Sequence, residues 1–150
     1  MTFRCRFPVA ILGAYLATQP LQAIGADQER TPDASNALGR EMSTCSAFFA
    51  LASSVLKSAL PDDATVGTRY DTAGKVMLAQ AIAVTEAVGI GPDTAVDWSR
   101  AAMQDMVKEI NADPKNSAAL MTSKYDKPCQ LLLKDSAKRL RELIDSGTPD

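Results

Sequence analysis

The sequence contains no histidine among its 150 residues. Without histidine, neither a Ser-His-Asp triad nor a Cys-His pair can form, and histidine ligation of a metal is excluded. The sequence also lacks Gly-x-Gly-x-x-Gly and Gly-x-x-x-x-Gly-Lys patterns ahead of a helix, so it indicates no phosphate-binding loop. No stretch alternates polar and apolar residues as a half-buried strand does. The sequence therefore predicts an all-α fold and no cofactor.

Three pairs of neighbouring carboxylates remain as candidates for acid–base chemistry: Asp62 with Asp63, Asp93 with Asp97, and Glu109 with Asp113. Acids of the first two pairs lie at predicted helix starts, where negative charge offsets the helix dipole. The third pair lies near a helix end on a solvated face. The segment after the first pair lacks the alternating ligands of a calcium loop. We therefore expect a non-enzymatic protein with no catalytic, cofactor-binding or metal-binding residue.

The first 26 residues have the order of a secretory signal peptide. Arg4 and Arg6 precede an apolar run over residues 8–18, and small residues follow. The run is shorter than the roughly 20 residues that cross a bilayer, which disfavours an uncleaved anchor. Cleavage after Ala23 or Ala26 leaves a small residue at the cut. We expect a periplasmic or secreted protein with no membrane span after cleavage.

The charge of the mature chain restricts its partners. Cleavage removes two arginines and no acidic residue, so the formal net charge falls from −2 to −4. Nucleic acids and anionic membrane surfaces attract domains with a basic excess, and this chain has none. The remaining length of about 125 residues is typical of one domain.

Two of the three cysteines remain in the mature chain. Cys5 precedes the apolar run and is lost with the signal, which leaves Cys45 and Cys129. An even pair in an exported protein predicts a disulfide. Because the α-carbons of a disulfide lie about 4.4 to 6.8 Å apart, the helices that carry these residues must be packed neighbours.

Apolar residues recur at steps of three and four in four segments, which predicts a small helical bundle of about four helices. These segments are residues 34–60, 68–88, 92–113 and 116–145. The domain organisation that follows is a signal peptide over 1–26, a disordered leader over 27–33, the bundle over 34–146 and a disordered tail over 147–150.

Glycine, proline and acidic residues predict how the helices end. Gly89 suits a left-handed cap at the end of the second helix. Thr94 and Asp97 have the spacing of a capping box for the third helix. Pro128 removes a backbone donor, so the last helix should kink or restart there, with Asp126 as a new cap.

The first two helices carry almost no charge over their middles, between Glu41 and Lys57 and between Lys75 and Glu86. Either they pack centrally against each other, or one face contacts a second copy or another protein. A basic face on the last helix is more often merely solvated, and the only tryptophan is more often packed in the core or at its edge than used as a platform for a ligand. The candidate interaction surface consists of Phe48, Trp98, Lys134, Lys138 and Arg141.

Three functional classes remain open. A carrier of a small apolar ligand would need an internal cavity lined by Phe48, Phe49, Met77, Met103 and Met106. The many alanines of the first two helices favour close helix approach instead of a cavity, and the missing histidine weighs against an enzyme. The favoured class is a protein–protein interaction module of the cell envelope, such as an inhibitor, an immunity protein or an assembly accessory. Its partner would be another protein or a second copy of itself.

Overall fold

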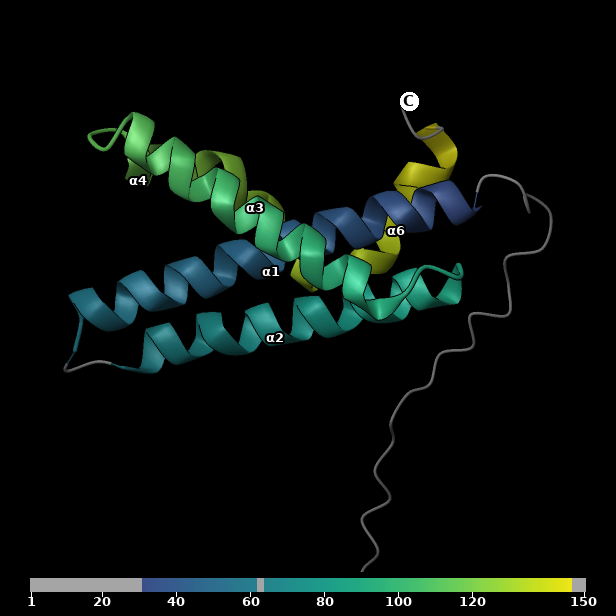
Figure 1. Cartoon of the computed structure of the whole chain (residues 1–150), viewed down its shortest axis with the longest axis horizontal. Coiled ribbons are helices and arrows are strands. Elements are labelled where there is room, and N and C mark those ends of the chain that lie inside the picture. Colours follow the sequence, from purple (N-terminus) through teal and green to yellow (C-terminus); the bar gives the residue numbers. More distant parts are fainter. Residues whose placement is uncertain (1–30, 62–63, 147–150) are drawn as a thin grey trace, which may run out of the picture.

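The computed structural model describes residues 31–61 and 64–146, and every regular element in these ranges is helical (Figure 1). The elements are α1 (Thr31–Ala59), α2 (Ala64–Ala87), α3 (Pro92–Ala112), α4 (Ser117–Met121), the π-helix η1 (Thr122–Asp126), α5 (Lys127–Lys134) and α6 (Ser136–Ser146). Because α4, η1 and α5 are continuous, the described residues form five helices, one more than predicted. The all-α class is confirmed.

The predicted domain limits are only partly covered by the described residues. The expected signal peptide and tail lie outside them, as do Asp62 and Asp63. Helix α1 begins at Thr31, so the last three residues of the expected leader are helical. In the described ranges no helix is both long and apolar enough to cross a membrane.

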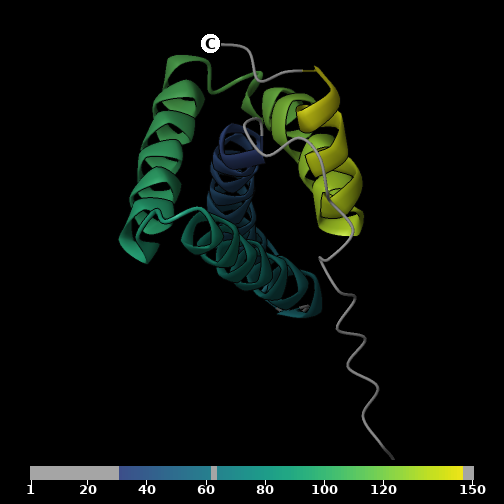
Figure 2. The ribbon, with the colours of Figure 1, turned by 90° about the vertical axis from the view of Figure 1, so that its right-hand side faces the viewer.

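Helix α1 is the central element of the fold. Figure 2 shows it between α3 on one side and the C-terminal helices on the other, with α2 along a third side. It packs most extensively on α2, then on α3, and it also contacts η1, α5 and α6. This position explains why a 29-residue helix carries so little charge over its middle. No residue of α1 after Ser53 is fully buried, and Val55 is 57% exposed.

Helices α1 and α2 form a closely packed antiparallel hairpin (Figure 1). The hydroxyl of Ser53 donates a buried hydrogen bond of 2.8 Å to the carbonyl oxygen of Gly67. A Cβ added at Gly74 would lie 3.2 Å from the carbonyl oxygen of Ser46. Ala47 and Ala81 are fully buried. The small residues of both helices therefore allow the close approach that the sequence predicted.

One of the two predicted caps around α3 is correct. Gly89 has a φ of 78°, in the left-handed region, and closes α2 as expected. The capping box is wrong, because Pro92 is the first residue of α3 and Gly91 precedes it as the N-cap. Asp97 consequently lies inside the helix, where it accepts a hydrogen bond of 2.6 Å from Arg100.

The chain does not restart at Pro128. It passes through the wider turn of η1, in which the backbone N–H of Lys127 bonds to the carbonyl oxygen of Thr122, five residues back. Such a turn relieves the crowding that proline causes in an α-helix. Asp126 makes no capping bond, contrary to the prediction. The break falls instead at Asp135, whose carboxylate accepts a bond of 2.8 Å from the N–H of Lys138 and caps α6.

The core combines one face of α1 with residues from every larger element around it. The apolar stripe predicted for the last segment is buried at Tyr125, Cys129, Leu132 and Leu143, although the segment is divided between η1, α5 and α6. The bend at Asp135 therefore redirects the chain without turning this stripe away from α1.

Candidate functional site: a groove beside the disulfide

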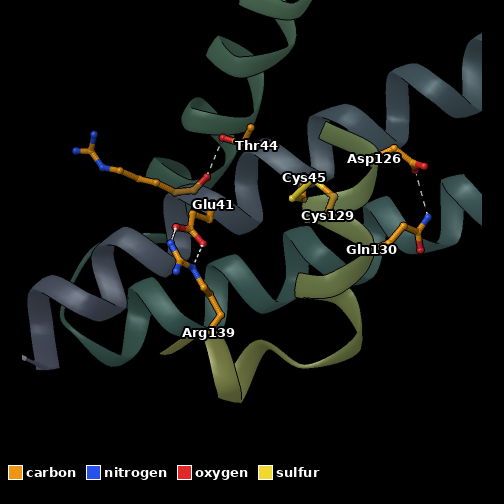
Figure 3. Close-up of a disulfide and its surroundings, with 8 residues drawn as sticks. Glu41, Thr44, Cys45, Asp126, Cys129, Gln130 and Arg139 are labelled. Atoms are coloured by element: carbon orange, nitrogen blue, oxygen red, sulfur yellow. Dashed lines mark hydrogen bonds and ion pairs between the residues drawn. A yellow bond between two sulfur atoms is a disulfide. The ribbon is translucent and has the colours of Figure 1, made fainter. Parts of the chain in front are cut away.

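The predicted disulfide is present. Cys45 of α1 and Cys129 of α5 are bonded, with their α-carbons 5.2 Å apart, across a separation of 84 residues (Figure 3). Both cysteines are buried. The bond holds the C-terminal helices against the middle of α1, as the sequence required.

An ion pair holds α6 to the same helix one turn earlier. Arg139 donates to both carboxylate oxygens of Glu41, from Nη2 at 2.6 Å and from Nε at 2.9 Å (Figure 3). This hydrogen bonding raises the pKa of the arginine, so the guanidinium stays charged. The disulfide and this bidentate pair fix α5 and α6 at two points on α1.

Helix η1 is anchored to the other helices through aromatic and acidic side chains. Tyr125 stacks on Phe48 of α1, with ring centroids 6.1 Å apart. Its hydroxyl donates a bond of 3.1 Å to Glu109 of α3, to which Lys124 also donates. The bond from Lys124 lowers the pKa of the Glu109 carboxyl, while burial raises the pKa of Tyr125.

Between these attachment points lies a groove with a volume of about 710 Å³. We call it the disulfide groove. Its walls come from α1, η1, α5 and α6, and it is lined by Arg40, Glu41, Thr44, Cys45, Lys124, Tyr125, Pro128, Cys129, Leu131, Leu132, Lys134, Asp135, Lys138, Arg139 and Glu142.

The apolar part of the groove comes mainly from α5. Pro128, Leu131 and Leu132 lie on this short helix, together with the disulfide. Leu131 is 69% exposed, the highest value among the exposed large apolar side chains of the described residues. Three consecutive leucines cannot all face the core of one helix, and here Leu132 is buried while Leu131 faces outward.

The charged part of the groove is predominantly positive. Five cationic side chains line it, namely Arg40, Lys124, Lys134, Lys138 and Arg139, against three carboxylates, Glu41, Asp135 and Glu142. The whole chain has the opposite balance, with a formal net charge of −2. The groove is therefore a locally positive region on an acidic protein.

The cations of the groove differ in how strongly they are already paired. Arg139 is held by Glu41, and Lys138 lies 3.7 Å from a carboxylate oxygen of Glu142. The guanidinium of Arg40 lies 4.7 Å from the ring centroid of Trp98. Lys134 has no ion pair to any residue in the described ranges.

The predicted interaction surface is only partly brought together. Lys134 and Lys138 line the disulfide groove, whereas Arg141 lies on α6 outside the lining set. Trp98 is half-buried and packs beneath Arg40. Phe48 is wrong as a surface residue, because it is buried in an aromatic cluster with Phe49, Tyr70 and Tyr125. The face of α1 that carries Phe48 is covered by η1, through Tyr125.

Leu131, Glu41 and Arg139 line the groove but were not predicted from the sequence. The run of three leucines was a usable signal for Leu131. Nothing local could pair Glu41 with Arg139, because 98 residues separate them. None of the five residues expected to line a carrier's cavity lines the disulfide groove.

Three of the candidate carboxylates have structural partners, and Asp97 pairs with Arg100. Glu109 binds Lys124 and Tyr125, while Asp113 accepts bonds from the backbone and side chain of Asn116. No group of three or more His, Cys, Asp or Glu within the described ranges could hold a metal ion. The groove can thus bind a partner by apolar contact and positive charge, and it brings together no acid–base pair free of other partners.

Comparison with protein-family models, with curated proteins and with solved structures gives no match to this chain. A function for this chain is therefore inferred from the geometry of the groove.

Proposed function

We propose that this chain is an exported, non-enzymatic interaction module that binds another protein in the disulfide groove. One observation carries the proposal, the exposed Leu131 on an apolar floor bordered by charged side chains. Apolar anchors inside a polar rim are the usual arrangement of a protein–protein contact. An inhibitor, an immunity protein or an assembly accessory of the cell envelope would each use such a surface.

Export is proposed on the order of basic, apolar and small residues at the start of the chain. The Cys45–Cys129 disulfide supports it, because such bonds persist in oxidising compartments. Intact-mass measurement of the protein from the periplasm of its native host tests this part. A mass that still includes Met1 would contradict it.

Affinity capture of the tagged mature protein from periplasmic extract tests the binding role. The test variant is Leu131→Gln, and the matched control is Val55→Gln, which changes an exposed apolar residue outside the groove. We expect the original protein and the Val55→Gln variant to capture the same partner protein, and the Leu131→Gln variant to lose it. Equal capture by both variants would reject the groove as the binding site.

Native mass spectrometry of the same preparations distinguishes the proposed function from that of a carrier of a small apolar ligand. A stoichiometric apolar ligand that co-purifies, with no protein partner and no self-association, would replace the proposed function.

A further inference from the structure

We propose that the occupant of the disulfide groove is an acidic protein segment with an apolar side chain that rests on Leu131. This inference depends on the proposed binding function and adds the chemistry of the partner. It is drawn from the positive balance of the groove, which is opposite to the balance of the chain.

Lys134 is the main reason for expecting an acidic partner. Its ammonium group has no ion pair among the described residues, and it lies on the same short helix as Leu131. A carboxylate that binds there gains a charge partner without displacing another one. Lys138 is only loosely held by Glu142 at 3.7 Å, so it is also open to a second carboxylate.

The dimensions of the groove suit a peptide segment. Its lining runs along the helix from Lys124 to Lys134, which is about 15 Å at the rise of an α-helix. An extended chain covers that distance with about four or five residues. The disulfide and the Glu41–Arg139 pair hold both walls in place before binding, so little ordering entropy is lost in the module itself.

The groove should also discriminate against segments of other composition. A basic segment would meet five cations against three carboxylates in the groove, and an acidic segment without an apolar residue would leave Leu131 exposed to water. Charge therefore selects the sign of the partner, and Leu131 selects for an apolar residue in it.

The test uses the mature protein labelled for two-dimensional NMR and three short peptides of equal length. One alternates glutamate and leucine, one alternates lysine and leucine, and one alternates glutamate and serine. We expect saturable shifts only with the first peptide, at residues that line the groove, such as Thr44 and Leu131. Higher salt should weaken this binding, because exposed charges are screened.

Variants then test the named cations. Reversing both lysines in Lys134→Glu/Lys138→Glu should weaken binding of the first peptide about tenfold, because two weak, exposed charge contacts become repulsive. The matched control is Lys115→Glu/Arg141→Glu, which makes the same charge change outside the groove. It should leave the affinity within about twofold. The single variant Lys134→Gln breaks no ion pair of the described residues and should weaken binding in the same direction.

The inference is overturned if the lysine peptide binds as well as the glutamate peptide, if no saturable shift occurs up to millimolar peptide, or if the two double variants behave alike. These results leave the proposed function standing when capture of a protein partner still depends on Leu131. Capture that is unaffected by Leu131→Gln rejects the proposed function itself.

Discussion

Arg139 of α6 and Glu41 of α1 form a bidentate ion pair, with donor–acceptor distances of 2.6 and 2.9 Å. It joins residues 98 positions apart and lies in the wall of the disulfide groove. The pair therefore links the position of α6 to the shape of the proposed binding site.

Removing the charge of Glu41 should destabilise the protein modestly. Both side chains are more than a third exposed, so we expect Glu41→Gln to lower the free energy of unfolding by about 1 kcal/mol. The control Glu142→Gln removes a longer contact of 3.4 Å to the same arginine and should cost less. Urea unfolding of the three proteins gives the comparison. An equal loss in both variants would contradict a special contribution of the bidentate pair.

Loss of the disulfide should have a larger effect. The bond closes a separation of 84 residues, and the chain-entropy model assigns roughly 4 kcal/mol to a loop of that length. Cys129→Ser should therefore lower stability by a few kcal/mol. The difference from the unmodified protein should vanish when both are measured under reducing conditions. Peptide mapping that found two free thiols, or cysteines bonded between chains, would contradict the assignment.

The close contact between α1 and α2 predicts the effect of a methyl group at Gly39. A Cβ at this position would lie 2.8 Å from Cγ2 of Thr85, a fully buried side chain. We expect Gly39→Ala to cost about 1 kcal/mol, because overpacking exceeds the gain in helix propensity.

The rescue variant for Gly39→Ala is Thr85→Ser. It removes the obstructing methyl group and retains the hydroxyl that donates to Ile82 at 2.9 Å. Thermal unfolding should show that Gly39→Ala lowers stability much less in the Thr85→Ser variant than in the original protein. If the two changes are simply additive, the proposed contact does not account for the cost.

Two tyrosines should make the protein sensitive to alkaline pH. Burial raises the pKa of Tyr70 and of Tyr125 above the ordinary value of 10.0, so the folded state favours the neutral phenols. Their contribution to stability is complete below that value and is lost as the pH rises through the raised pKa. Stability measured by urea unfolding should therefore fall above about pH 10.

The double variant Tyr70→Phe/Tyr125→Phe tests the cause of this alkaline loss. It keeps the aromatic contacts with Phe48 and removes both ionisable groups. Its stability should decline less steeply over the same pH range. An unchanged slope would assign the loss to the lysines instead.

The helices could be predicted because their apolar spacing is a local property of the sequence. The disulfide could be predicted because the number of cysteines left only one possible pair. Leu38, Met42 and Cys45 repeat at helical spacing and are buried, and only one partner was left for Cys129 after removal of Cys5. The bend at Asp135 was missed because the apolar stripe continues through it. The aspartate was a usable capping signal, since its carboxylate binds the N–H of Lys138.

The candidate site could not be predicted in the same way, because it depends on which helices cover which faces. Phe48 looked available from the charge-free stretch of α1, but η1 places Tyr125 against it. Lys134 and Arg141 share one basic face only in a continuous helix, and the break at Asp135 separates them. These relationships are set by contacts between segments far apart in the chain.

The π-helix η1 fixes the rotational phase of everything after it. A π turn corresponds to an α-helix with one inserted residue, and each residue of an α-helix turns the chain by about 100°. Deleting one residue within Thr122–Asp126 would therefore rotate α5 by about that angle relative to α4. Cys129 would then point away from Cys45, and Leu132 would leave the core. One extra residue, within the segment three to seven positions before Cys129, is thus what allows this disulfide to form.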